Sequence, residues 1–121
     1  IGERIGEGHQ QLILGGGYDH NWELNVPSDG AVHPVCTLSD PVSGRKMEVL
    51  TDQPGLQFYS GNFFDGKYCG KVQGLPIGHR EALALETQKW PDGVNHPDFP
   101  NTILRPGEVY TQHTVYRFSA E

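Results

Sequence analysis

The chain has 121 residues and a formal net charge of −6, with nine Lys and Arg residues against fifteen Asp and Glu residues. This length fits one domain or a part of one. The basic residues are scattered and form no stripe, which argues against a nucleic-acid partner. No apolar stretch approaches the roughly 20 residues of a membrane-spanning helix, so we expect no membrane partner either.

The start of the chain and its two cysteines give expectations about its context. Residues 1–4 (IGER) contain neither the charged nor the apolar region of a signal peptide. They also lack an initiator Met, so we expect the chain to begin inside a longer protein. Cys36 and Cys69 have no CxxC or metal-ligand spacing. We therefore expect them to be buried or half-buried thiols in a cytoplasmic protein.

Glycine and proline interrupt the chain too often for long helices, and no window shows sustained apolar residues at helical spacing. Short runs typical of β-strands occur instead. They occupy residues 35–38, 46–51, 56–60, 82–88 and 109–118. The sequence DPVSG at 40–44 separates the first two runs and predicts a hairpin. The pattern as a whole predicts an all-β fold, either a sandwich or a barrel.

The first segment with polar chemistry is GGGYDHNW at residues 15–22. Three consecutive glycines permit unusual backbone angles and the close approach of another group. The following side chains offer a ring, a carboxylate, an imidazole and an amide. A turn in which Asp19 and Asn21 cap local backbone amides explains the same residues. Composition alone favours this second interpretation.

The second polar segment follows the turn Pro54-Gly55. Strand alternation places Gln57 and Tyr59 on one face, opposite Leu56 and Phe58. An amide beside an aromatic ring suits a sugar, because the amide bonds hydroxyl groups and the ring lies against C–H groups. Taken by itself, an ordinary solvated sheet face is the simpler explanation.

The third polar segment is the strand-like run at 82–88, in which Glu86 interrupts an apolar sequence. Alternation puts Glu86 and Gln88 on one face with Ala82 and Ala84, whose small side chains leave space. We expect this face to form the floor of a ligand cleft that shields Glu86 from water. Burial disfavours the ionised form of a carboxylate and tunes it as a general base. A charged residue at a sheet edge is an equally weighted alternative.

Other kinds of site are not expected. The six histidines show no HxH or HExxH spacing, so the sequence predicts no metal site. The triple glycine does not form a GxGxxG motif, and no serine lies in a nucleophile elbow.

The three polar segments, in this order, resemble the aldose 1-epimerase (galactose mutarotase) family. The similar stretches are GGGYDHN at 15–21, SGRKMEVLTDQPGLQFYSGNFFDG at 43–66 and LALETQKWPDGVNHPDFPNTILRPGE at 83–108. TVYRFS at 114–119 is similar to the last strand of that family. The resemblance implies a large β-sandwich, of which residues 1–121 correspond to the C-terminal part. A complementary N-terminal chain or fragment would complete the domain.

The resemblance also implies an activity, the interconversion of the α and β anomers of a free monosaccharide such as galactose or glucose. Glu86 would be the general base, while Asp19 and Gln57 would bind the sugar hydroxyls. We add Tyr59 as a substrate-binding residue because it shares a strand face with Gln57. The reaction is acid–base chemistry that needs no cofactor and no metal.

The chain departs from the family in one large respect. The family's proton donor is a His in an HxYFNL-like segment, and neither this segment nor the other upstream substrate-binding residues are present here. We therefore expect little catalysis from the isolated chain. Two alternatives remain open: a non-catalytic carbohydrate-binding remnant, and a glycoside hydrolase in which Asp19 and Glu86 flank a glycosidic bond.

Overall fold

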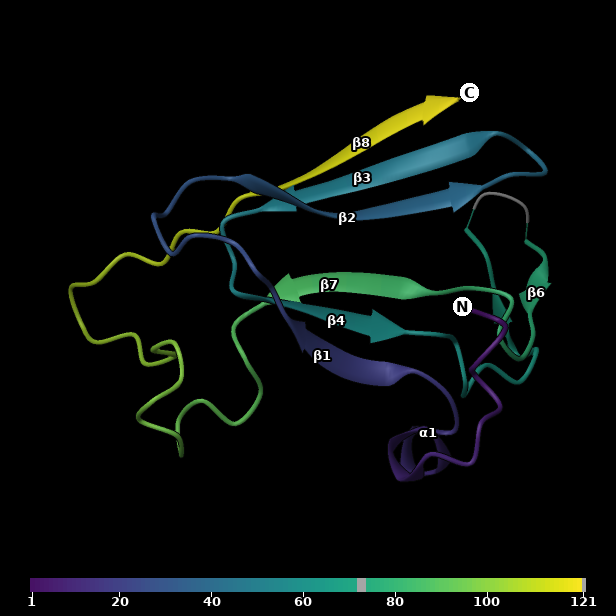
Figure 1. Cartoon of the computed structure of the whole chain (residues 1–121), viewed down its shortest axis with the longest axis horizontal. Helices are drawn as coiled ribbons and strands as arrows, with labels where there is room; N and C mark the ends of the chain where they lie inside the picture. The colour runs from purple at the N-terminus through teal and green to yellow at the C-terminus, as the bar shows by residue number, and fades with distance from the viewer. Residues whose placement is uncertain (72–73, 121) are drawn as a thin grey trace. The chain divides into compact units, whose positions relative to one another are not determined.

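A computed structural model describes residues 1–71 and 74–120 of the chain. Among the described residues, the regular secondary structure consists of one short helix, α1 (Gln10–Gly15), and β-strands, which turns and loops connect, so the all-β prediction is confirmed (Figure 1). The strands are β1 (Asp19–Glu23), β2 (His33–Asp40), β3 (Arg45–Thr51), β4 (Gly55–Tyr59), β5 (Tyr68–Cys69), β6 (Pro76–Ile77), β7 (Ala84–Gln88) and β8 (Thr114–Ala120).

The strands form two three-stranded sheets, with orders β1-β4-β7 and β2-β3-β8, and a small two-stranded sheet of β5 and β6. In the second sheet β3 lies between β2 and β8 and pairs with both in antiparallel fashion (Figure 1). Its register with β8 joins Thr51 to Thr114 and Arg45 to Ala120. The side chain of Val49, in the middle of β3, is fully buried.

The predicted hairpin joins β2 to β3. The Asp40 carboxylate accepts hydrogen bonds from the amides of Val42 and Ser43 and from the Ser43 hydroxyl. Gly44 then adopts a positive φ of 71°, and its amide donates to the Asp40 carbonyl at 2.9 Å. Asp40 and Gly44 therefore form the predicted turn. Asp40 contributes an Asx-type arrangement, and Gly44 contributes the left-handed backbone conformation.

The chain divides into two compact units, Ile1–Trp22 with Gln57–Glu86, and Glu23–Leu56 with Thr87–Glu121. The first unit contains the aromatic contact of Tyr18 with Phe58, whose ring centroids are 5.4 Å apart. The second contains the Trp90–Phe99 edge contact, at 5.0 Å. All four residues discussed below as site candidates belong to the first unit.

Three local expectations differ from the structure. The segment 15–22 holds both the end of α1 and the start of β1, where the sequence favoured a turn. The predicted strand at 109–118 begins only at Thr114, and Val109 is 85% exposed. Cys36 is half-buried as expected, but Cys69 is exposed. It lies on the two-residue strand β5, and its neighbour on that strand, Tyr68, is exposed as well.

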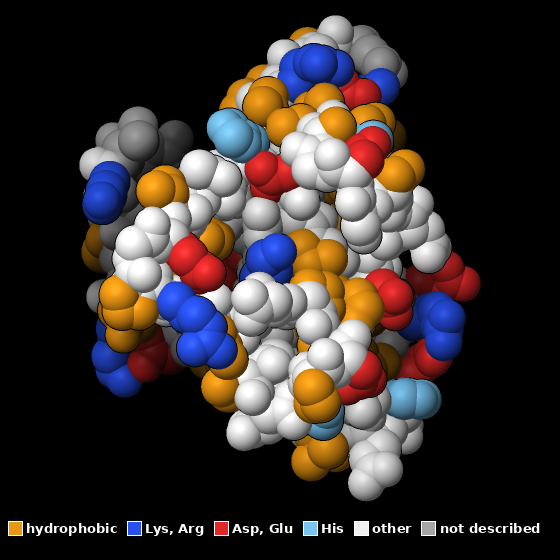
Figure 2. Space-filling view, turned by 90° about the vertical axis from the view of Figure 1, so that its left-hand side faces the viewer, with side chains coloured by type: hydrophobic (Ala, Val, Ile, Leu, Met, Phe, Trp, Pro, Cys, Tyr) orange, Lys and Arg blue, Asp and Glu red, His pale blue; other side chains and the backbone are white. Residues whose placement is uncertain are grey.

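Charged side chains of both signs occur on one face of the molecule (Figure 2). On the face drawn in Figure 2, Lys and Arg side chains are interspersed with Asp and Glu, and the described residues form no continuous basic patch there. None of the helical segments in the described part of the chain has the length and apolar character needed to cross a membrane.

Candidate active site

Asp19 and Gln57 meet across neighbouring strands of the β1-β4-β7 sheet. The Gln57 side-chain amide Nε2 donates a hydrogen bond to Asp19 Oδ1 at 2.8 Å, and both residues are half-buried. The two residues are 38 positions apart in the sequence. A hydrogen bond to an ionised carboxylate is among the stronger kinds in proteins. The structure therefore brings together two residues that the sequence singled out separately.

The end of helix α1 delivers Asp19 to this position. Gly16 has a left-handed φ of 64° and caps the helix, and Gly17 donates its amide to the Leu12 carbonyl at 2.9 Å. Left-handed glycine is the usual way to end a helix, because other residues pay a steric penalty there. The triple glycine thus serves as a helix stop that turns the chain directly into β1.

Glu86 lies on β7, the strand that flanks β4 on the side opposite to β1. Its side chain is exposed, and its carboxylate has no hydrogen-bond or ion-pair partner among the described residues. The expectation that Glu86 is shielded from water is therefore wrong for this chain. Ala84, its neighbour on the same strand face, contributes only a methyl group, which is too short to cover a glutamate side chain.

The Tyr59 side chain contacts residues that follow it closely in the chain, Phe63 and Phe64. Its hydroxyl accepts a hydrogen bond from the Phe63 amide at 2.9 Å, and its ring stacks on Phe63 with centroids 6.1 Å apart. A second ring, Phe64, lies at the same centroid distance. These contacts give Tyr59 a local packing role.

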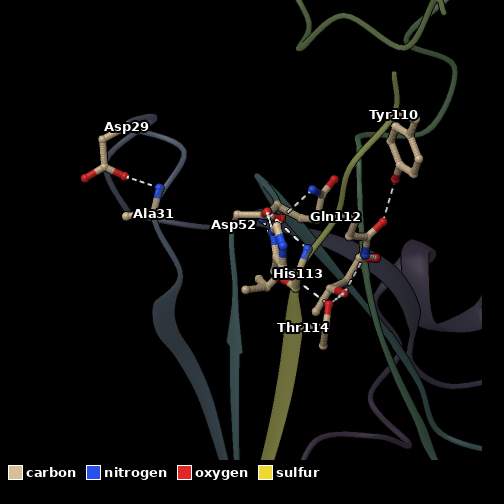
Figure 3. Close-up of polar contacts among 10 residues, drawn as sticks. Asp29, Ala31, Asp52, Tyr110, Gln112, His113 and Thr114 are labelled. Atoms are coloured by element: carbon tan, nitrogen blue, oxygen red, sulfur yellow. Dashed lines mark hydrogen bonds and ion pairs between the residues drawn. The ribbon is translucent and has the colours of Figure 1, made fainter. Parts of the chain in front are cut away.

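A polar cluster in the second unit was not predicted from the sequence (Figure 3). Asp52 Oδ2 accepts from the His113 amide at 3.0 Å and lies 2.9 Å from His113 Nδ1, while Oδ1 accepts from Gln53 Nε2 at 2.7 Å. Burial raises the pKa of the Asp52 carboxyl, but the hydrogen bonds from Gln53 and His113 outweigh burial and hold the pKa below its ordinary value. Asp52 is therefore a half-buried anchor for the loop that enters β8.

The cluster continues from β8 to β7. Thr114 Oγ1 lies 2.6 Å from Thr87 Oγ1, and Gln112 Nε2 donates to the Thr87 carbonyl at 2.8 Å. Tyr110 in turn donates its hydroxyl proton to Gln112 Oε1 at 2.5 Å (Figure 3). The only signal in the sequence was the polar run TQHT inside the predicted strand at 109–118. That run covers the last three residues before β8 and the first residue of the strand, Thr114.

A cavity is also present among the described residues, but Asp19, Gln57 and Glu86 are not among the residues that line it. This cavity of about 580 Å³ in the second unit has Asp52, Gln53, Trp90 and Phe99 among its lining residues and none of the predicted site residues. No group of three or more His, Cys, Asp or Glu side chains in the described part of the chain is arranged to hold a metal ion.

The sequence of the chain can now be compared with those of known proteins. The sequence profile of the aldose 1-epimerase family matches residues 2–117. The chain belongs to that family, as the three motifs predicted.

Curated relatives agree with this assignment. The chain is 46% identical over 111 residues to the galactose mutarotase of Homo sapiens, covering 92% of this chain and 32% of the relative. It is 46% identical over 103 residues to the galactose mutarotase of Mus musculus, covering 85% of this chain and 29% of the relative. It is 40% identical over 110 residues to the aldose 1-epimerase of Escherichia coli (strain K12), covering 87% of this chain and 30% of the relative. The chain thus spans about a third of the length of these relatives.

Proposed function

We propose that residues 1–121 are the C-terminal part of an aldose 1-epimerase domain and contribute to the interconversion of the α and β anomers of a free aldohexose. The hydrogen bond between Gln57 Nε2 and Asp19 Oδ1 carries this proposal, because it joins two residues for which the family resemblance implies a role in binding sugar hydroxyls. The relatives' names support an anomer of galactose as the first substrate to test. A cytoplasmic setting, expected from the cysteines, belongs to the same proposal.

Asp19 and Gln57 act in this proposal as a pair that binds sugar hydroxyl groups. Among the described residues, the one side chain that donates to the Asp19 carboxylate is Gln57, and it uses Oδ1. Oδ2 then remains for a hydroxyl donor of the substrate. A carboxylate held by an amide keeps a fixed direction, which a sugar site needs in order to distinguish hydroxyl positions.

Glu86 is the proposed general base. It takes the proton from O1 of the sugar, C1=O1 forms as the C1–O5 bond breaks, and an acid protonates O5 to give the open aldehyde. Reclosure of O5 on the other face of the carbonyl carbon, with the protons moving in reverse, gives the other anomer. We expect the acid and the cover over the exposed Glu86 to come from sequence outside this chain.

The complete domain tests the proposal. The chain is combined with the complementary region of its parent protein, and the mutarotation of freshly dissolved α-galactose is followed by polarimetry. Glu86→Gln removes the base and is expected to lower the rate by about 10²- to 10⁴-fold. Glu3→Gln is the matched control, because Glu3 is an exposed glutamate of the same unit without a partner among the described residues. Equal rates for the wild type and Glu86→Gln would contradict the proposed role of Glu86 as the general base.

A second candidate function is carbohydrate binding without turnover. The exposure of Glu86 favours it, since a solvated carboxylate lacks the shielding that tunes a general base. Titration calorimetry of the complete domain with galactose separates the two functions. Binding together with catalysed anomerisation supports the epimerase, whereas binding with only the uncatalysed rate supports the alternative.

A further inference from the structure

Two buried polar side chains follow β4 in the first unit, Ser60 and Asn62. Their residues are only 5% and 8% exposed, which is unusual for serine and asparagine. Buried polar groups are costly unless they are hydrogen-bonded, and both of these are. Ser60 Oγ lies 2.6 Å from Asn62 Oδ1 and is oriented to donate to it. The two side chains therefore form one buried unit, here called the Ser60–Asn62 pair.

The pair holds the residue that precedes Asp19. Ser60 Oγ accepts a hydrogen bond from the Tyr18 amide at 3.0 Å, and Asn62 Nδ2 donates to the Tyr18 carbonyl at 3.0 Å. The Ser60 backbone amide donates to the same carbonyl at 2.9 Å. Both backbone polar groups of Tyr18 are thus bound by the segment that follows Gln57.

The pair also fixes the glycine turn that ends α1. Asn62 Nδ2 donates to the Gly15 carbonyl at 2.9 Å. Gly17 has a φ of 140°, and a methyl group placed on it would overlap the Asn62 side chain. Glycine at this position therefore permits close packing of the turn against Asn62.

We propose that Ser60 and Asn62 are positioning residues for Asp19, holding its carboxylate within hydrogen-bonding distance of Gln57. The peptide unit between Tyr18 and Asp19 is planar, so binding the Tyr18 carbonyl also fixes the plane of the Asp19 amide. The direction in which the Asp19 side chain leaves the strand is then set from the far end of β4. The role in catalysis rests on the proposed function, while the geometric role does not.

The geometric test uses the 121-residue chain and the NMR signals of the Gln57 side-chain amide. Asp19→Asn provides the reference spectrum, because it changes the acceptor. Ser60→Ala removes the hydroxyl but leaves the backbone bond from Ser60 to Tyr18. We expect Ser60→Ala to shift the Gln57 amide signals toward the Asp19→Asn reference and to speed the exchange of their protons with solvent.

A destabilising control separates positioning from general stability. Val49→Ala truncates a fully buried side chain of the second unit and is expected to lower stability without moving the Gln57 amide signals. If Ser60→Ala does not fold, Asn62→Asp replaces it. That variant keeps the side-chain shape but turns the donor that faces the Gly15 and Tyr18 carbonyls into an acceptor, and the same shift is expected.

The kinetic arm uses the complete domain. Ser60→Ala is expected to lower kcat/KM by about tenfold, in line with a weakened charge-assisted hydrogen bond. A folded Ser60→Ala chain with wild-type Gln57 amide signals overturns the positioning proposal. If the signals shift as expected but Glu86→Gln keeps the wild-type rate, the positioning stands and the proposed function is the part that fails.

Discussion

Asp19 takes its proposed role from its surroundings more than from its own chemistry. An aspartate that follows a triple glycine is consistent with a turn, and composition alone favours that interpretation. The decisive contact comes from Gln57, 38 positions later in the chain, at 2.8 Å. A hydrogen bond to a charged group contributes roughly 1.5–3 kcal/mol, which corresponds to about 10- to 100-fold in affinity or rate.

Asp19→Asn tests this contact in the complete domain. The neutral amide weakens the bond to Gln57 and removes the charged acceptor for a sugar hydroxyl, so kcat/KM for galactose anomerisation should fall by about 10- to 100-fold. Asp65→Asn is the control, since Asp65 is an exposed aspartate of the same unit that pairs with Lys67. A similar loss in both variants would contradict a specific role for Asp19.

Asp52 gives a pH dependence of stability. Hydrogen bonds from Gln53 and His113 overcome the effect of burial and lower its pKa from the ordinary 3.8. The native state then binds fewer protons than the unfolded state, so this contribution is present above pH 3.8 and is lost as the pH falls through the native pKa. In urea unfolding, Asp52→Asn should flatten the decline in stability below pH 4.

The comparison for Asp52 is Asp98→Asn, which changes an exposed aspartate of the same unit that has no partner among the described residues. It should leave the acid decline of the wild type in place. If Asp52→Asn shows the same acid decline as the wild type, the hydrogen bonds at Asp52 are not its source.

The β2–β3 hairpin shows how far local sequence can determine an element. Asp40 and Gly44 each have a preferred place in a turn, and the flanking runs alternate as strands do. Their pairing is between near neighbours in the chain, so the sequence pattern was sufficient. Both predicted strands of the hairpin lie within the observed ones, β2 and β3.

Gly44→Ala tests the turn. An alanine at the observed φ of 71° adopts a left-handed conformation, which costs roughly 1–2 kcal/mol. The urea unfolding midpoint should fall accordingly. Gly8→Ala, where φ is not in the left-handed range and nothing lies within 4 Å, should change stability by less than about 0.5 kcal/mol. Equal stability of the two variants would show that the turn is not strained by a side chain.

Elements that depend on distant contacts could not be predicted in this way. Strand β1 is polar over most of its length, and its neighbour β4 lies more than 30 residues further along the chain. The Asp52–His113 contact joins residues 61 apart, and no local pattern indicates it. Glu86 was expected to be shielded because its strand is apolar, but shielding depends on what lies above the strand. The sequence thus predicts which side chains share a face of a strand better than it predicts which residues cover that face.

The whole chain spans about a third of the length of its curated relatives. Among the described residues, β8 pairs on one side only, with β3, and its Phe118 side chain is 74% exposed. An unpaired strand edge and an exposed aromatic ring are typical binding surfaces for further strands. We therefore expect the complementary part of the domain to cover β8.

Hydrogen exchange tests this expectation. Addition of the complementary part should slow the exchange of those β8 amides that are unpaired in the isolated chain. The amides of β3, which pairs with strands on both sides, serve as the internal comparison. Slowing confined to β3, with β8 unchanged, would show that the partner does not bind along this edge.

Chemical rescue of the proposed base is the most direct measurement of the central claim. In the complete domain, the exchange between α- and β-galactose at equilibrium is followed by NMR magnetisation transfer between the two anomeric protons. Removal of the carboxylate by Glu86→Ala should abolish the catalysed exchange, and added formate should restore it in proportion to its concentration. Exchange in Glu86→Ala at the wild-type rate, without formate, would contradict the account.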